Sequence, residues 1–323
     1  MSSKVSGPSD PSVSVVMPAL DVEVTIGAAI ASVLRQSLAD FELIVIDDGS
    51  TDTTAAIVRG ISDTRITVLE QDHRGAAAAR NAGVRAARAP IVVLVDSDDL
   101  LMPRYLELTS EALRANPEAG FAYTDAYVLN ADSGRIRRTT ATQRYRPAPP
   151  PRTAEELHAA LIEVNFVYNA VSMPRSVFDQ VGFFDESLRA AIDYEMWLRV
   201  AAHGFTAVET AGPPLAVYRS GRRGSISSDR ECVLTNLARM YEIALRQHPG
   251  SAEARALTRN RQEFVAAELA AVRGARTMDA FRRRGRDTLA RARSRVRSDA
   301  VWYPRDAPPA EFSAAFPDLS SRG

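Results

Sequence analysis

The chain has 323 residues, of which 46% are hydrophobic and 25% charged, values that are ordinary for a soluble globular protein. Basic and acidic residues number 40 each, so the overall charge does not favour nucleic acid as a partner. The single cysteine, Cys232, excludes a disulfide within the chain and fits a reducing compartment. No run reaches the roughly 18 apolar residues that a membrane span needs, so a cytoplasmic protein is expected.

Strands and helices are predicted to alternate through the first third of the chain. A polar N-terminal tail over residues 1–11 comes first. Apolar runs rich in Val, Ile and Leu then predict strands over 12–17, 41–46, 65–69 and 91–95. Helical spacing or an Ala-rich composition predicts helices over 26–34, 55–59, 73–89 and 103–115. This order is typical of an α/β protein with a doubly wound, mostly parallel central sheet flanked by helices.

Three carboxylates follow the predicted strand 91–95: Asp96, Asp98 and Asp99. Carboxylates so close in the chain repel one another unless a cation or solvent compensates their charge. Because no thiol or imidazole accompanies them, the cation they suit is a hard one, Mg²⁺ or Mn²⁺. The alternative is an acidic turn that caps the helix beginning near Pro103.

A second acidic pair, Asp47 and Asp48, follows the predicted strand 41–46. The carboxyl ends of parallel strands lie at one edge of a sheet, where open α/β sheets bind their ligands. A buried strand has no structural need for such residues at its end. The two acidic strand ends together therefore favour a ligand site over a pair of capping turns.

The alternation ends after residue 115. A strand over 121–129, a Pro-rich loop over 144–152 and then shorter strands and helices are expected, and the chain is mostly helical from residue 229. The patterns predict a tail (1–11), one domain (12–228) with halves 12–115 and 116–228, and a helical C-terminal extension (229–323). Cys232 is expected to pack within a helix, and three prolines between 304 and 309 predict a frayed end.

Residues 273–297 form a predicted helical segment with ten Arg against two Asp. It has three interpretations: a solvated helical cap, an element facing an anionic membrane surface, or a contact for a polyanionic acceptor. Its apolar face is thin, which favours the cap. Membrane association at the inner face nevertheless stays open as an expectation for the protein.

Six segments, taken in order, resemble the motifs of inverting glycosyltransferases of family 2, which have the GT-A fold. They are 15–21, 46–52, 74–83, 96–99, 181–186 and 193–199, and the resemblance extends from residue 12 to residue 227. Each motif is modest alone, but the ordered set is specific. The resemblance implies an enzyme that moves a sugar from a nucleoside-diphosphate sugar, UDP- or dTDP-linked, to an acceptor hydroxyl.

The resemblance also implies roles on the donor side. Asp48 would contact the nucleotide base, with Pro18, Ala19 and Asp21 lining the same pocket. Arg80 would contact phosphate, although a solvated helix residue is an equal alternative. Asp96 would lie near the ribose or donor sugar and, with Asp98, hold the Mn²⁺ or Mg²⁺ ion.

On the acceptor side, the resemblance makes Asp193 the general base that takes the proton of the acceptor hydroxyl. The competing interpretation is an N-cap for the helix that follows. Glu195 and Trp197 fall in the same acceptor-side segment, although a core position is favoured for Trp197 over contact with a sugar. The acceptor itself stays open between a cell-envelope glycan, a lipid-linked sugar and a small natural product.

Two positions depart from the family pattern. Ile192 replaces the usual acidic residue before the base. The His that many relatives carry after the equivalent of Tyr218–Arg219 is absent, and Arg222 and Arg223 follow in a Gly-flanked loop. Guanidinium groups match phosphate geometry, so these two arginines are predicted to close over the diphosphate, with a solvated loop as the alternative.

Two other functions compete with sugar transfer. A sugar nucleotidyltransferase would need a Gly-rich loop after the first strand to hold a triphosphate, and residues 18–21 offer none. A nucleotide-sugar-binding module without catalysis would account for Ile192 and the missing His as decay. The retained acidic residues argue against it, and the oligomeric state is left undetermined.

Overall fold

The computed structural model describes residues 10–137, 147, 149–168, 170–221, 226–284 and 310–316. Its strands are β1 (Val13–Ala19), β2 (Phe41–Asp47), β3 (Ile66–Glu70), β4 (Ile91–Leu94), β5 (Leu100–Leu101), β6 (Ala119–Tyr123), β7 (Ala126–Asn130), β8 (Val171–Pro174), β9 (Thr206–Glu209) and β10 (Ala216–Ser220). Its α-helices are α1 (Ile26–Leu34), α2 (Thr54–Arg59), α3 (Ala76–Ala86), α4 (Tyr105–Ala115), α5 (Ala154–Glu163), α6 (Arg175–Val181), α7 (Ile192–Ala202), α8 (Arg230–Gln247), α9 (Ala252–Arg284) and α10 (Ala310–Ala315).

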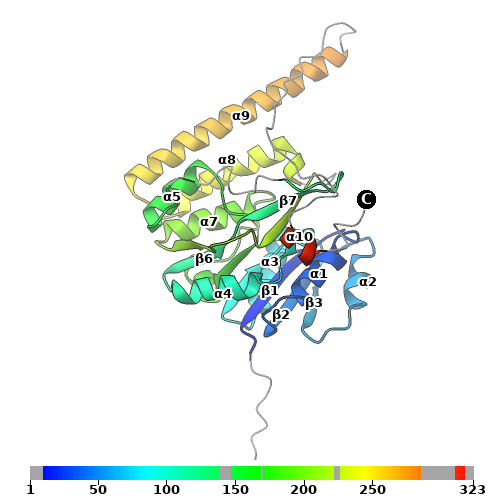
Figure 1. The fold of residues 1–323 in the computed structure, drawn as a ribbon. Coiled ribbons are helices and arrows are strands. Elements are labelled where there is room, and N and C mark those ends of the chain that lie inside the picture. The colour runs from blue at the N-terminus through cyan, green and yellow to red at the C-terminus, as the bar shows by residue number, and fades with distance from the viewer. Residues whose placement is uncertain are drawn as a thin grey trace, which may run out of the picture.

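A seven-stranded sheet with the order β3-β2-β1-β4-β8-β6-β9 forms the centre of the protein (Figure 1). The four strands from β3 to β4 are parallel, β8 runs antiparallel to β4 and β6, and β9 is parallel to β6. The predicted mostly parallel sheet is therefore confirmed. The chain steps outward from β1 to β3 and then returns to place β4 on the other side of β1. Such a switch point is where open α/β sheets bind ligands.

The central strands are buried on both faces, which explains their continuous apolar runs. Along β1, Val13, Val15 and Met17 pack into one core cluster, and Val16 packs into the other. Helices α1 and α4 contribute to the first cluster. Helices α3 and α7 contribute to the second. Because successive side chains of a strand point to opposite faces of the sheet, β1 contributes to the core on both sides.

The prediction of one strand over residues 121–129 is wrong. The structure divides it into β6 in the large sheet and β7 in a second sheet of order β5-β10-β7. The break falls at Thr124–Asp125, where Thr124 Oγ1 accepts a hydrogen bond from Leu215 N and Asp125 O accepts another from the same amide. Strand β10 therefore enters beside β7 and pairs on its other side with β5, directly after the acidic segment 96–99.

The C-terminal extension shares the core of the domain. Leu234, Met240 and Tyr241 of α8 and Val265 and Leu269 of α9 belong to the cluster that contains α3 and α7. Helix α9 lies over α8, and its C-terminal part extends away from the sheet (Figure 1). No helix in the described ranges is both long enough and apolar enough to cross a membrane.

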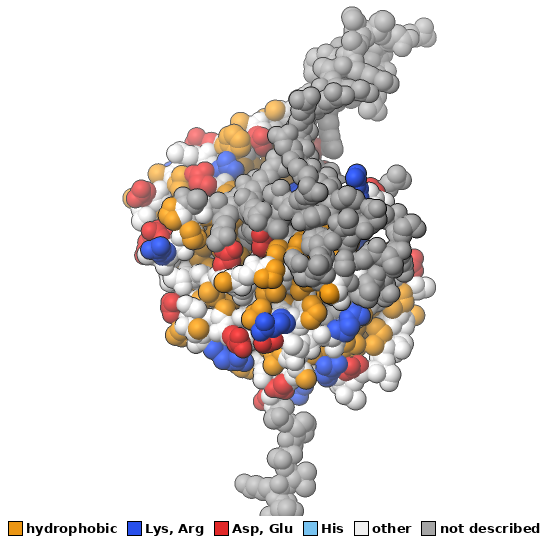
Figure 2. Space-filling model, viewed as in Figure 1, with side chains coloured by type: hydrophobic (Ala, Val, Ile, Leu, Met, Phe, Trp, Pro, Cys, Tyr) orange, Lys and Arg blue, Asp and Glu red, His pale blue; other side chains and the backbone are white. Residues whose placement is uncertain are grey.

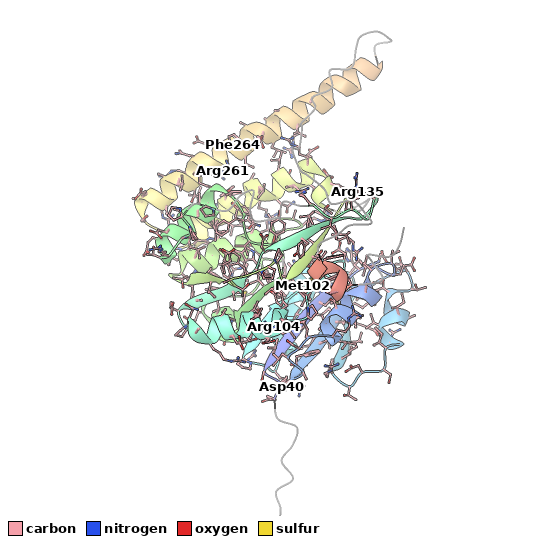
Figure 3. The ribbon with its side chains drawn as sticks, in the orientation of Figure 1. Asp40, Met102, Arg104, Arg135, Arg261 and Phe264 are labelled. Carbon is pink, nitrogen blue, oxygen red and sulfur yellow. The ribbon has the colours of Figure 1, made fainter. Side chains whose placement is uncertain are left out.

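Among the described side chains of α9, Phe264 is the large apolar one that is exposed. Phe264 is 51% exposed, and the Arg261 guanidinium lies 4.9 Å from the centre of its ring (Figure 3). On the face shown in Figure 2, basic and acidic side chains of the described residues are interspersed. This distribution agrees with the balanced charge of the sequence.

The frayed end predicted from the prolines is wrong for residues 310–316. Helix α10 lies there, and its Phe312 and Phe316 are 1% and 5% exposed. The Phe312 ring meets Tyr127 of β7 edge-on, with 6.1 Å between the ring centres. The two buried aromatic side chains dock a short helix, which the proline-rich sequence before it does not predict.

Gly83 lets α3 approach the sheet closely. A Cβ atom there would lie 2.4 Å from Val16 Cγ1 and 2.7 Å from Ile46 Cδ1, closer than real contacts allow. Gly83→Ala is therefore expected to lower the free energy of unfolding by up to about 2 kcal/mol, because overpacking costs about 1–3 kcal/mol against a gain of ~1 kcal/mol in helix propensity. Urea unfolding measures the change. Gly274→Ala in α9, which meets nothing within 4 Å, is the matched control and should stabilise; a stabilised Gly83→Ala would contradict the packing argument.

Candidate active site

The carboxylates of Asp96, Asp98 and Asp99 converge after β4. Their oxygens lie within 4.8 Å of one another, so the structure adds Asp99 to the predicted pair. Asp99 is 5% exposed and accepts a hydrogen bond from Arg219 N at 2.9 Å. Burial, together with the charges of Asp98 and Asp96, raises the pKa of Asp99 well above its usual range.

This carboxylate cluster fits a divalent cation. All the candidate ligand atoms are carboxylate oxygens, the ligand type that Mg²⁺ and Mn²⁺ prefer. A cation among them would reduce the repulsion of Asp99 by Asp98 and Asp96. Arg219 also donates from Nε to the backbone oxygen of Asp98 at 2.8 Å. Strand β10 therefore helps to hold Asp98 and Asp99 in place through Arg219.

Arg80 of α3 neutralises part of the cluster. Its Nη2 lies 2.5 Å from Asp96 Oδ1, and its side chain is 10% exposed. Burial opposes the charged form of Arg80, but the neighbouring charges of Asp96 and Asp193 outweigh it and raise the pKa of Arg80. The alternative of a solvated helix residue is therefore wrong, whereas the phosphate contact stays a prediction.

Asp193, in the first turn of α7, lies beside the same group of charges. Burial raises the pKa of Asp193, the charge of Arg80 opposes this, and Asp96 adds to it. The helix begins at Ile192 with Ala191 as its N-cap residue, so the interpretation of Asp193 as the N-cap is wrong. Ile192 is 6% exposed and belongs to the core, which explains an apolar residue at that position.

Backbone strain marks two points around this group. Asp21 and Ala191 have φ of 48° and 56°, and no other non-Gly residue in the described ranges has a positive φ. Such conformations persist where surrounding contacts enforce them, often at functional sites. Asp21 follows β1 and Ala191 precedes Asp193, so both border the acidic edge of the sheet.

Asp48 organises a loop rather than presenting a free carboxylate. Oδ1 accepts hydrogen bonds from Gln71 Nε2 (2.6 Å) and Arg74 N (2.8 Å), while Oδ2 faces His73 Nδ1 (2.9 Å) and Gly75 N (2.8 Å). A carboxylate has about four acceptor positions, and all are occupied. The predicted direct contact between Asp48 and a base therefore does not fit this arrangement; Asp48 instead fixes the start of α3.

The predicted base pocket has its walls at the ends of β1 and β2. Ala19 O accepts a hydrogen bond from Asp48 N at 2.9 Å, which places residues 18–21 against the turn after β2. Asp21 Oδ1 in turn accepts from Thr51 N at 2.7 Å. Pro18, Ala19 and Asp21 thus lie together at the switch point, and their contact with a base stays a prediction.

Glu195 and Trp197 do not lie on an acceptor-facing surface. They are 1% and 0% exposed, and the Phe121 and Trp197 rings are 5.1 Å apart in the core. A contact with the acceptor therefore does not fit either residue, because α7 turns both side chains inward, and the core interpretation of Trp197 is confirmed. Arg222 and Arg223 lie outside the described residues, as does the 285–297 part of the Arg-rich segment.

The residue that sequence reasoning missed is Asn81. Its side chain accepts from Phe184 N at 2.9 Å and donates to Phe184 O at 3.0 Å, and it also donates to Glu186 Oε1 at 2.9 Å. Arg74 Nη2 bonds to the other oxygen of Glu186 at 3.0 Å. Helix α3 is thereby fastened to the segment that leads to Asp193. The position of Asn81 next to Arg80, within the motif segment 74–83, is the feature of the sequence that could have identified it.

A hollow of about 710 Å³ lies between α8 and α9, beside the same segment. Its lining mixes carboxylates, guanidinium groups, carboxamides and hydroxyls with a few apolar side chains. The residues are Asp185, Ser187, Thr235, Ala238, Arg239, Glu242, Ile243, Arg246, Gln247, Gln262, Glu263, Ala266, Leu269 and Arg273. Asp185 and Ser187 flank Glu186, so the hollow, called here the α8–α9 groove, borders the loop that Asn81 holds.

The switch-point sheet with its acidic edge defines an α/β protein of the GT-A fold, as the motifs predicted. Residues 14–182 match the family model described as glycosyl transferase family 2, and the chain belongs to this family. The family assignment made from the six segments is thus confirmed.

Two relatives illustrate the similarity. The chain is 38% identical over 122 residues to the UDP-Glc:alpha-D-GlcNAc-diphosphoundecaprenol beta-1,3-glucosyltransferase WfgD of Escherichia coli, which covers 38% of this chain and 48% of that protein. It is 30% identical over 247 residues to the succinoglycan biosynthesis protein ExoU of Rhizobium meliloti, covering 71% and 67%. The chain thus spans about half the length of the first relative.

Solved structures share the fold at lower identity. Staphylococcus aureus TarS 1–349 in complex with UDP-GlcNAc has a TM-score of 0.58 at 18% identity, over 80% of this chain and 71% of that one. The mannosyltransferase PcManGT of Pyrobaculum calidifontis, in complex with GDP-Man and Mn²⁺, has a TM-score of 0.56 at 20% identity, over 84% and 81%.

Proposed function

We propose that the protein transfers a sugar from a nucleoside-diphosphate sugar to an acceptor hydroxyl, with inversion at the anomeric carbon. The observation that carries the proposal is the position of Asp193 beside Arg80 and Asp96, at the carboxyl edge of the switch-point sheet. Asp193 supplies a candidate base, and the neighbouring carboxylates and Arg80 supply charges suited to a cation and a diphosphate. Membership of the family supports the same reaction.

In this mechanism Asp193 accepts the proton of the acceptor hydroxyl while that oxygen attacks the anomeric carbon. The bond between the anomeric carbon and the diphosphate oxygen breaks at the same time, and the nucleoside diphosphate leaves with the electron pair. Asp96, Asp98 and Asp99 would hold a divalent cation, which supplies charge neutralisation to the leaving group when bound. Arg80 keeps Asp96 oriented, and Asn81 keeps the loop before Asp193 in place.

The donor class follows from the pocket and the relatives. Residues 18–21 lie against the turn after β2 at the switch point, where a nucleotide base is proposed to bind, and solved structures of the fold carry UDP-GlcNAc or GDP-Man. A UDP- or dTDP-sugar is the proposed donor. Relatives named for a diphosphoundecaprenol-linked substrate and for succinoglycan biosynthesis favour an acceptor in cell-envelope polysaccharide synthesis, glycan or lipid-linked.

A donor panel tests the proposal. The purified protein is incubated with UDP-, dTDP- and GDP-sugars and Mn²⁺, with and without lipid-linked or oligosaccharide acceptors. Release of nucleoside diphosphate that an acceptor accelerates is the expected result, with a product of inverted anomeric configuration by NMR. Pyrophosphate release from a nucleoside triphosphate and sugar phosphate would instead identify a nucleotidyltransferase. Donor binding without turnover across the acceptor panel would identify a binding module and end the transferase proposal.

The α8–α9 groove is the proposed path for the acceptor beyond its reacting sugar. Its planar polar groups suit saccharide hydroxyls, and its floor contains Ala238 and Leu269. Ala266→Trp would fill the groove and is expected to raise the acceptor KM at least tenfold, while donor hydrolysis without acceptor stays unchanged. Ala267→Trp, exposed on the same helix but outside the lining, is the matched control. An unchanged acceptor KM in Ala266→Trp would remove the groove from the acceptor path.

A further inference from the structure

Glu195 is an ionisable side chain buried in the helix that carries Asp193. It is two positions after Asp193, so it lies on the opposite side of α7, and its side chain is 1% exposed. Arg199, one turn later, donates to Glu195 Oε1 from Nε at 2.9 Å and to Oε2 from Nη2 at 2.8 Å. The proposed mechanism does not use Glu195, which leaves its burial to be explained.

The second partner of Glu195 comes from the C-terminal extension. His248, in the turn between α8 and α9, lies with Nε2 2.9 Å from Glu195 Oε1 and is 4% exposed. A carboxylate flanked by Arg199 acts as the acceptor, so Nε2 carries the proton of this bond. His248 Nδ1 is buried without a hydrogen-bond partner. The bond to Glu195 is therefore the polar contact that orients the ring.

The contacts continue from α7 to the active site without a gap. Arg199 donates from Nη1 to Val181 O at 2.6 Å and from Nη2 to Phe183 O at 2.8 Å. The next residue, Phe184, is held through both of its backbone polar groups by Asn81. Arg80, beside Asn81 on α3, bonds to Asp96. Polar contacts, linked by adjacent residues of the backbone at 183–184 and 80–81, thus join the α8–α9 turn to the carboxylate cluster.

We infer that His248 is a positioning residue for the proposed sugar transfer, acting through Glu195 and Arg199 on the helix that presents Asp193. The inference rests on the proposed function and extends it, because it makes the C-terminal extension part of the catalytic unit. Arg199 and His248 both stabilise the charged form of the buried Glu195, and the bond from His248 also ties α7 to the α8–α9 turn. It fixes the rotation of α7, and with it the direction in which Asp193 points.

Two substitutions of His248 distinguish the effect of its hydrogen bond to Glu195 from the effect of the volume of its ring. His248→Phe keeps an aromatic ring and removes the donor. His248→Gln keeps an N–H donor that can reach Glu195. With the donor and acceptor that the panel identifies, His248→Phe is expected to lower kcat at least tenfold with the donor KM within twofold of the unmodified protein. His248→Gln is expected to stay within threefold in both constants. The control is His203→Gln, a substitution of an exposed His at the C-terminal end of α7.

Hydrogen exchange supplies a readout that does not depend on turnover. The amides of residues 193–199 are expected to exchange faster in His248→Phe than in His248→Gln, with both proteins folded by circular dichroism. Equal exchange in the two variants would overturn the inference, and so would an unchanged kcat in His248→Phe or equal losses in both. An unmodified protein that transfers no sugar would instead overturn the proposed function. In that case the exchange experiment still decides whether His248 holds α7.

Discussion

Asp193→Asn is expected to lower the turnover number by about 10²–10⁴-fold, the usual contribution of a positioned general base. Asn has nearly the same shape but does not accept a proton at neutral pH. Because the base acts only in the transition state, kcat and kcat/KM should fall together while donor affinity is retained. Steady-state kinetics and donor titration calorimetry measure the two quantities. Asp179→Asn, an exposed site on α6, is the control.

The pH profile gives the same prediction a second test. Burial raises the pKa of Asp193 above its usual range, with Arg80 opposing part of that rise. A base must be ionised to accept a proton, so turnover should fall as the pH drops through this raised pKa. The acid limb of kcat is then expected above pH ~4, where an ordinary Asp would titrate. A loss of less than threefold in Asp193→Asn, or an acid limb unchanged by the substitution, would assign the base to another group.

The donor half was readable from sequence because its signals are local. An apolar run buried on both faces needs no partner to be recognised, and the acidic residues at its end mark the edge where ligands bind. The positions of Asp96 and Asp98 followed from this reasoning. Asp48 shows its limit: the residue was singled out, but its four hydrogen bonds come from residues 71–75, whose path the sequence does not reveal.

The acceptor half was less predictable because its signals are not local. Glu195 and Trp197 lie in a helix whose motif looked acceptor-facing, yet core packing against Phe121 decides which side of α7 turns inward. His248 is 53 residues from Glu195 in the chain, and no spacing rule connects them. The division between β6 and β7 likewise depends on Leu215, 90 residues from Asp125. In each case the missing information is a tertiary contact rather than a propensity.

Asp98→Asn is expected to weaken divalent-ion binding and to lower turnover by about 10²–10³-fold, because charge stabilisation by such an ion contributes several kcal/mol and each 1.4 kcal/mol is tenfold in rate. The cluster of three carboxylates would lose one anionic ligand while its shape is retained. Mn²⁺ binding, followed by electron paramagnetic resonance, tests the site independently of activity. The ion should bind the unmodified protein, bind more weakly to Asp98→Asn, and raise the melting temperature of the former alone.

Chelation distinguishes two ways in which the negative charge of the carboxylate cluster can be balanced, by a bound cation or by Arg80. If they serve a cation, EDTA should abolish donor turnover, and Mn²⁺ or Mg²⁺ should restore it in Asp179→Asn but only weakly in Asp98→Asn. If Arg80 alone balances their charge, EDTA should change nothing, and Asp98→Asn should be more stable because a repulsive charge beside the buried Asp99 has gone. The two explanations thus predict opposite responses to EDTA. An EDTA-resistant enzyme would leave Arg80 as the cation that faces the diphosphate.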